Sequence, residues 1–114
     1  MLAANYDITL DRAADYAFVL TIEDVEGVAV NTSTATFEAD IRSTATKAQA
    51  VEFTLPPTIP STGVIPFTLT KADTKLLKAG EGLYEYDIFM VLDGKTRRLL
   101  YGSVTVRPQF TNNV

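Results

Sequence analysis

Apolar and polar residues alternate with a period of two through most of this 114-residue chain, and that period limits the chain to a fold built from strands. In the clearest case, Phe37, Ala39 and Ile41 alternate with charged or hydroxyl side chains. Segments with the same pattern lie at 16–22, 51–55, 65–69, 84–92 and 100–106. Turn or proline signals separate them, which predicts half-buried antiparallel strands.

One segment departs from this period and predicts a short helix. Thr70 precedes it as an N-cap residue, and Asp73 follows three positions later, as in a capping box. Gly80 is placed to end the helix in the left-handed conformation. We therefore expect a helix over 71–79 that docks on the sheet through Leu76 or Leu77, because a helix this short is unstable alone.

The number and spacing of these elements predict the fold class. About seven strands with one short helix indicate an all-β chain, a single antiparallel β-sandwich of immunoglobulin-like or related type. Pro66 places its strand at a sheet edge, and Gly102 suggests a bulge. No segment is long enough to be a linker, so residues 1–114 are expected to form one domain. The expected core is Tyr16, Phe18, Leu20, Phe37, Ile41, Phe53, Phe67, Tyr86, Ile88, Leu100 and Val104.

Composition excludes several classes of function. The chain has no cysteine and no histidine, which removes disulfides, thiolate or imidazole metal sites and Ser-His-Asp triads. Ten basic residues against 14 acidic ones, with no basic run, argue against nucleic acid or an anionic membrane as partner. No apolar run is long enough to span a bilayer, and the first residues do not form a signal peptide.

Two sets of carboxylates were candidates for chemistry. Asp7, Asp11 and Asp15 are spaced by four, but a calcium loop needs closely spaced oxygens and a glycine, which this stretch lacks. Glu85 and Asp87 share one strand face, yet a domain this small offers little room for a glycosidase cleft. We therefore expect no catalytic residue, no metal site and no cofactor.

Apolar residues on the expected outer faces are the stronger anomaly, since exposed apolar patches mark interfaces. Arginines near the last turn, together with Lys95 and Arg107, could pair with carboxylates of a neighbour. The candidate interface is Val19, Phe89, Val91, Arg97, Arg98, Leu99 and Tyr101, with Leu83 as a further exposed position. The alternative is that the helix or a loop covers the last hairpin, so that both of its faces are interior.

The last third of the chain carries a family resemblance. Its segments are Leu76-Leu77-Lys78-Ala79-Gly80, Tyr84-Glu85-Tyr86-Asp87-Ile88, Asp93-Gly94, Arg98-Leu99-Leu100-Tyr101-Gly102 and Val104-Thr105-Val106-Arg107-Pro108. This run resembles small virion proteins of tailed bacteriophages, including the N-terminal domain of phage baseplate upper proteins. The N-terminal half is similar more loosely, and Asp11–Asp15 stands where the family often has a glycine-containing turn.

The resemblance implies a non-enzymatic structural protein of the virion. It would act as a tail, baseplate or neck adaptor or a fibre anchor, assembling by symmetric contacts with other virion proteins or with its own copies. A capsid decoration protein is one alternative. Another is a soluble carbohydrate- or protein-binding module that uses Tyr84 or Tyr101 as a stacking platform.

Overall fold

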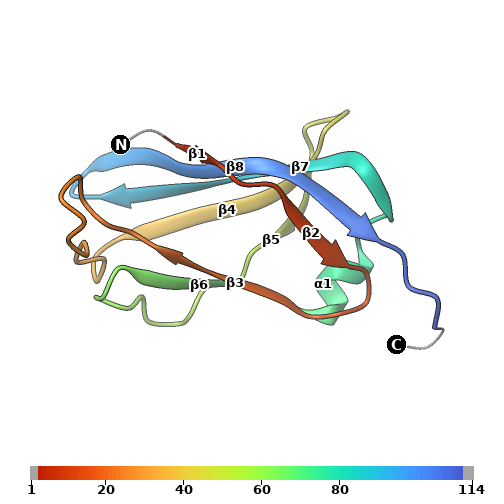
Figure 1. The fold of residues 1–114 in the computed structure, drawn as a ribbon, viewed down its shortest axis with the longest axis horizontal. Helices are drawn as coiled ribbons and strands as arrows, with labels where there is room; N and C mark the ends of the chain where they lie inside the picture. Colours follow the sequence, from red (N-terminus) through yellow and green to blue (C-terminus); the bar gives the residue numbers. More distant parts are fainter. Residues whose placement is uncertain (1–2, 112–114) are drawn as a thin grey trace.

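The computed structural model describes residues 3–111, which form two sheets and one short helix (Figure 1). The elements are β1 (Ala4–Asn5), β2 (Ile8–Asp11), β3 (Tyr16–Thr21), β4 (Thr36–Ser43), β5 (Gln49–Glu52), β6 (Val64–Leu69), α1 (Lys71–Lys75), β7 (Gly80–Leu92) and β8 (Lys95–Arg107). This part of the chain therefore has eight strands instead of about seven. The chain is predominantly β with one very short helix, as the alternation predicted.

The two sheets differ in size and in strand direction. The large sheet has the order β1-β8-β7-β4-β5, with β2 also paired to β8, and the small sheet consists of β3 and β6. Both β1 and β2 run parallel to β8, so the expectation of a wholly antiparallel fold is wrong at this edge. Alternation in the sequence indicates which face a residue takes, but it does not determine which strand lies beside it. Pro66 lies in β6, an edge strand of the small sheet, as predicted.

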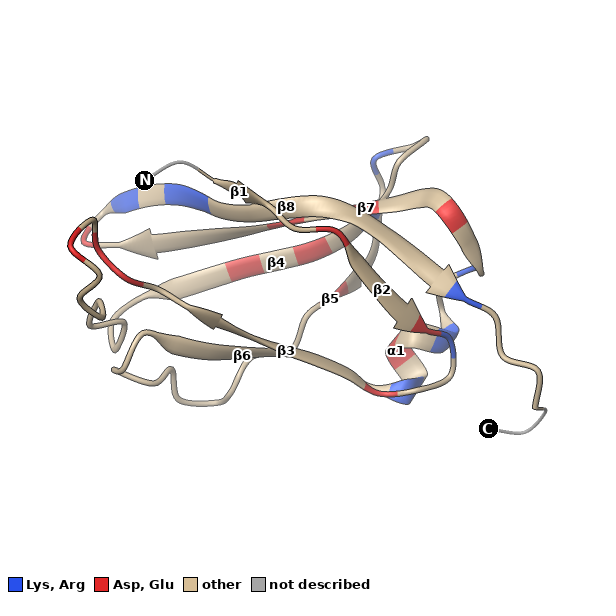
Figure 2. Cartoon of the chain, viewed as in Figure 1, with Lys and Arg blue, Asp and Glu red and all other residues tan. Residues whose placement is uncertain are grey.

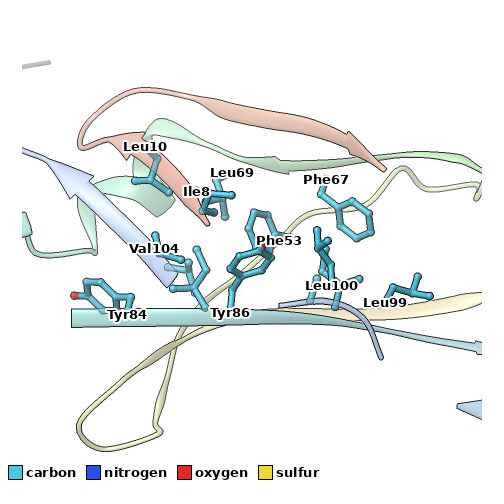
Figure 3. Close-up of a cluster of buried hydrophobic side chains, with 14 of the residues drawn as sticks. Ile8, Leu10, Phe53, Phe67, Leu69, Tyr84, Tyr86, Leu99, Leu100 and Val104 are labelled. Atoms are coloured by element: carbon cyan, nitrogen blue, oxygen red, sulfur yellow. The ribbon is translucent and has the colours of Figure 1, made fainter. Parts of the chain in front are cut away.

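Side chains from both sheets meet in one apolar core (Figure 3). Phe67 of β6 is fully buried, with its ring centroid 5.4 Å from that of Phe18 and 5.9 Å from that of Phe37. Most of the predicted core is buried: Ile41, Phe53, Phe67, Tyr86, Ile88, Leu100 and Val104. The other four predicted core residues are half-buried and pack against it: Tyr16, Phe18, Leu20 and Phe37.

Strands β7 and β8 form the predicted hairpin, closed at Asp93 and Gly94, which both have positive φ. Ile88 pairs with Leu100, but Phe89 pairs with Arg98, so Leu99 is an extra residue in β8. This bulge lets two successive leucines enter the core, and Leu99 is only 6% exposed. Leu99 is therefore a core residue, and its prediction as an interface residue is wrong.

Leu99→Ala should lower the free energy of unfolding by about 2–4 kcal/mol, because it removes a buried side chain and leaves a cavity. Leu83→Ala is the matched control, since Leu83 is 42% exposed on the adjacent strand. Urea denaturation of both variants checks the prediction. Equal, small losses would show that Leu99 does not contribute to the core.

Gly102 has a role other than the predicted bulge, because the register of β8 is regular there. A Cβ at this position would lie 2.3 Å from the carbonyl oxygen of Tyr6. The Tyr86 hydroxyl donates a hydrogen bond of 2.5 Å to the same oxygen, and burial raises the pKa of Tyr86, so the hydroxyl keeps its proton. The Ser103 amide donates to Asp7 Oδ1 at 3.0 Å. These contacts hold the N-terminal segment against β8.

Gly102→Ala should destabilise the protein by about 1–3 kcal/mol, because the new methyl group meets backbone atoms that cannot yield without displacing the N-terminal segment. Ser103→Ala, at the adjacent exposed position, should have a much smaller effect. Thermal denaturation measures both variants. A Gly102→Ala protein as stable as the control would contradict the close approach.

Helix α1 begins as predicted but ends earlier. Thr70 and Asp73 form the capping box, with both reciprocal hydrogen bonds present. The helix ends at Lys75, and the Arg12 side chain donates to the carbonyls of Lys75 and Leu77 at 2.9 and 3.0 Å. These hydrogen bonds satisfy carbonyls near the end of the helix, so no glycine cap is needed there. The predicted end of the helix at Gly80 is therefore wrong, and Gly80 instead starts β7.

The helix segment docks on the sheet through Leu77, one of the two leucines predicted for this role. Leu77 is buried in the core, whereas Leu76 is 69% exposed. Helix α1 is short, and residues 3–111 contain no helix that is long and apolar enough to cross a membrane.

Candidate protein–protein interface

The outer face of the large sheet carries most of its acidic residues, which colour β4 and β7 in Figure 2. Strand register aligns these residues in a row across the sheet. Asp40 of β4 lies opposite Asp87 of β7 on one side and opposite Glu52 of β5 on the other. Tyr101 of β8 continues the row next to Asp87. Carboxylates placed directly opposite one another repel, so this row needs compensating cations.

Two arginines supply that compensation. Arg42 Nη2 lies 2.9 Å from Asp40 Oδ2, and Arg98 Nη2 lies 3.5 Å from Asp87 Oδ2. The next row has a further pair, in which Lys47 Nζ is 2.5 Å from Glu85 Oε1. Surface pairs of this kind each contribute about 0–1 kcal/mol, so the acidic row is balanced only in part.

Glu52→Lys should raise the free energy of unfolding by about 0.5 kcal/mol, because it replaces a repelling carboxylate opposite Asp40 with an attracting cation. The gain should shrink in high salt. Glu26→Lys, in the turn after β3, makes the same charge change away from the row and serves as control. Urea denaturation at low and high salt measures the effect, and an equal change in both variants would contradict it.

The same face contains a shallow hollow of about 470 Å³ between β4, β7, β8 and the N-terminal segment. Asp7, Asp40, Asp87 and Arg98 are among its lining residues. The guanidinium carbon of Arg98 lies 4.4 Å from the centre of the Tyr101 ring, a cation–π contact that covers one ring face. The hollow is therefore lined by charges of both signs and by the aromatic side chain of Tyr101, among others.

An apolar area adjoins this hollow toward the β7–β8 turn. Phe89 is half-buried and pairs with Glu38 and Arg98, and Val91 is 38% exposed. We call Phe89, Val91, Arg98 and Tyr101 the outer-face patch. All four lie on the outward side of the β7–β8 hairpin, so the structure brings together four of the seven predicted interface residues.

The other three predicted residues lie elsewhere. Leu99 is in the core, and Val19 projects from the outer face of the small sheet, where it pairs with Pro66. Arg97 pairs with Met90 and therefore takes the opposite face from Arg98. The seven candidate residues therefore do not form one surface: Leu99 lies in the core, Val19 lies on the other sheet, and Arg97 faces away from Arg98.

The predicted basic cluster also disperses. Lys95 and Arg97 lie at the turn end of β8, whereas Arg107 lies at its other end. Both Arg107 donors bind the Asp11 carboxylate, at 2.7 and 3.1 Å. That pair joins β8 to β2, so it is used within the chain.

The spaced aspartates Asp7, Asp11 and Asp15 have separate structural contacts. Asp7 accepts from the Ser103 amide and Asp11 from Arg107, while Asp15 accepts from the Lys71 amide at 2.7 Å. In the part of the chain that the structure describes, no group of three or more histidine, cysteine or acidic residues is arranged to hold a metal ion.

The two tyrosines considered as stacking platforms are both engaged. Tyr84 is only 8% exposed, and its hydroxyl accepts the Lys78 amide at 2.9 Å. Tyr101 has Arg98 over its ring. The sequence did not reveal the acidic row, because only the register of β4, β5 and β7 places those carboxylates side by side.

Comparison with known proteins gives a likeness in fold only. No protein-family model and no curated protein matches the sequence. Among solved structures, the chain is similar to the extracellular domain of the voltage-gated sodium channel beta4 subunit, whose parallel homodimers explain its role in cell–cell adhesion. The TM-score is 0.53 at 12% identity, covering 96% of this chain and 97% of that one.

The second similar structure is Tim-1, with a TM-score of 0.51 at 11% identity, covering 98% of this chain and all of that one. Both are immunoglobulin-like extracellular domains. The fold of this chain is therefore similar to that of immunoglobulin-like domains.

Proposed function

We propose that this chain is a non-enzymatic β-sandwich of immunoglobulin type that serves as a structural component of a tailed-bacteriophage particle. It assembles through protein–protein contacts made by the outer-face patch. The observation that carries the proposal is the convergence of Phe89, Val91, Arg98 and Tyr101 on one exposed face of the β7–β8 hairpin.

The chemistry of this patch suits a protein partner. Aromatic residues and arginine are enriched at the centres of interfaces, and a polar rim surrounds such centres. Here Phe89 and Val91 form the apolar part, and the hollow beside Arg98 supplies the polar part. The homodimeric state of the similar sodium channel subunit domain supports an interaction role for this fold.

The placement in a virion is supported by the sequence run from Leu76 to Pro108, which resembles baseplate upper proteins. On that basis the chain is a tail, baseplate or neck adaptor or a fibre anchor, in contact with other virion proteins and with its own copies. A carbohydrate-binding role has less support, because Tyr84 is buried and Tyr101 is covered by Arg98.

Phe89→Asp and Tyr101→Asp should leave the fold intact and abolish incorporation into particles, because each places a charge in the proposed contact. Val25→Asp is the control, since Val25 is 98% exposed in a turn away from the patch. Circular dichroism tests folding, and mass spectrometry of purified particles tests incorporation. Folded variants that incorporate like the control would rule out the patch as the contact.

Copy number in purified particles then locates the protein. A small count relative to the major capsid protein, in multiples of about three or six, is expected for a tail, neck or baseplate component with cyclic symmetry. A much larger count would indicate capsid decoration. Absence from particles would overturn the virion assignment and favour a soluble binding module.

A further inference from the structure

Strand β3 has an unpaired edge along its whole length. Among the described residues it pairs only with β6, and Ala17, Val19 and Thr21 lie opposite Thr68, Pro66 and Val64. Thr68 directs its amide and carbonyl away from β3, to Thr54. Ala17, the register partner of Thr68, therefore directs its amide and carbonyl away from β6, and Val19 and Thr21 do the same because these orientations alternate along the strand. Within residues 3–111 these groups of Ala17, Val19 and Thr21 meet no other strand.

The other edge of the same sheet is blocked. On β6, Pro66 has no amide hydrogen, and the Thr68 amide donates to the Thr54 carbonyl at 3.0 Å. The Val64 amide donates to the Thr62 hydroxyl at 3.4 Å. Every outward amide position of β6 is thus either absent or occupied, so only β3 can accept a further strand in this sheet.

The sequence of β3 lacks the usual protection of an edge. Its six residues, YAFVLT, contain no charge, no proline and no glycine, and its register shows no bulge. Natural proteins protect long edges with such features. The other unblocked edge strands, β1, β2 and β5, have two to four residues. Inner side chains Tyr16, Phe18 and Leu20 are only half-buried at this edge.

We propose that β3 is a second interaction surface, and that its occupant is β3 of a second copy, added antiparallel about a two-fold axis. The pairing joins two small sheets into one of four strands. The backbone amide and carbonyl of Ala17 in each copy form hydrogen bonds with the carbonyl and amide of Val19 in the other copy. This is association by strand addition, with no other partner needed.

Charge selects the register. A two-fold axis at Val19 would place Asp15 of one copy opposite Glu23 of the other, at both ends of the interface, and like charges directly opposite repel. An axis at Phe18 instead places Asp15 opposite Thr21 and brings the two Phe18 rings together on the inner face. That register pairs apolar residues on both faces and separates the carboxylates.

The contact is small, so the association is weak by itself. Pairing of one six-residue strand buries less than the roughly 1,200 Å² of a stable interface, and we expect a dissociation constant of about 10⁻⁴ M. The proposal does not need the outer-face patch, which lies on the other sheet. Copies held together by that patch would pair more strongly at this edge through their raised local concentration.

Sedimentation velocity at concentrations up to about 1 mM tests the proposal. The unmodified chain should show a concentration-dependent dimer, and Val19→Lys should weaken it at least tenfold by placing two cations on the same face, diagonally across the strand pair. Val64→Lys is the matched control, because Val64 has the same side chain on the same outer face of the blocked strand. A monomer throughout, or equal weakening by both variants, would overturn the proposal.

Disulfide trapping tests the register even though the association is weak, because the covalent bond accumulates from a small associated fraction. The chain has no cysteine, so Ala17→Cys and Val19→Cys proteins each carry a single thiol. The proposed pairing places their Cα atoms about 5.5 Å apart in different copies, within reach of a disulfide. Mixing the two proteins under mild oxidation should give a mixed disulfide in preference to either homodimer, and Ala17→Cys with Val64→Cys should give none.

The proposed contacts at the outer-face patch and at the β3 edge can be tested independently of one another. Phe89→Asp should retain the mixed disulfide, because the outer-face patch lies away from β3. Loss of particle incorporation with the disulfide retained would support both surfaces. No preference for the mixed disulfide would overturn edge pairing, whatever the outcome for incorporation.

Discussion

Attachment of the N-terminal strands to β8 is the constraint on which the rest of the fold depends. It requires the absence of a side chain at Gly102, where the Tyr6 carbonyl approaches the backbone, and Tyr86 binds that same carbonyl from the core side. Because β1 and β2 are thereby committed to the large sheet, they cannot cover β3. Strands β1 and β2 form one edge of the large sheet, and the small sheet consists of β3 and β6 alone.

Local patterns predicted the parts of this fold that local physics determines. The alternation around Phe37–Ile41 became β4, the Asp93-Gly94 turn closed the last hairpin, and Thr70 with Asp73 capped the helix. In each case the signal and the structure it specifies lie within a few residues of one another. Such elements are predictable because tertiary contacts reinforce what the sequence already favours.

Features that depend on distant partners were not predictable. The bulge at Leu99 reverses the faces expected from alternation for Leu99, Arg98 and Arg97, so that Arg98 rather than Arg97 lies on the outer face. Arg12 ends the helix from a loop far away in sequence. The row formed by Asp40, Asp87 and Glu52 exists only because three strands share one register, which no single segment specifies. The candidate site was therefore predicted in part, as the outward side of one hairpin.

The outer-face patch and the β3 edge have different physical character. The first offers charged and aromatic side chains, so the contact we propose there would depend on complementarity and on salt. The second offers backbone groups, which we propose are satisfied by β3 of a second copy.

Pro66 on β6 limits how many copies can join through this sheet. When two β3 edges pair, both outer strands of the joined sheet are β6, and each presents a missing or occupied amide at every outward position. Addition therefore stops at two copies. The proposed pairing would therefore be self-terminating, and filaments would not extend from this sheet.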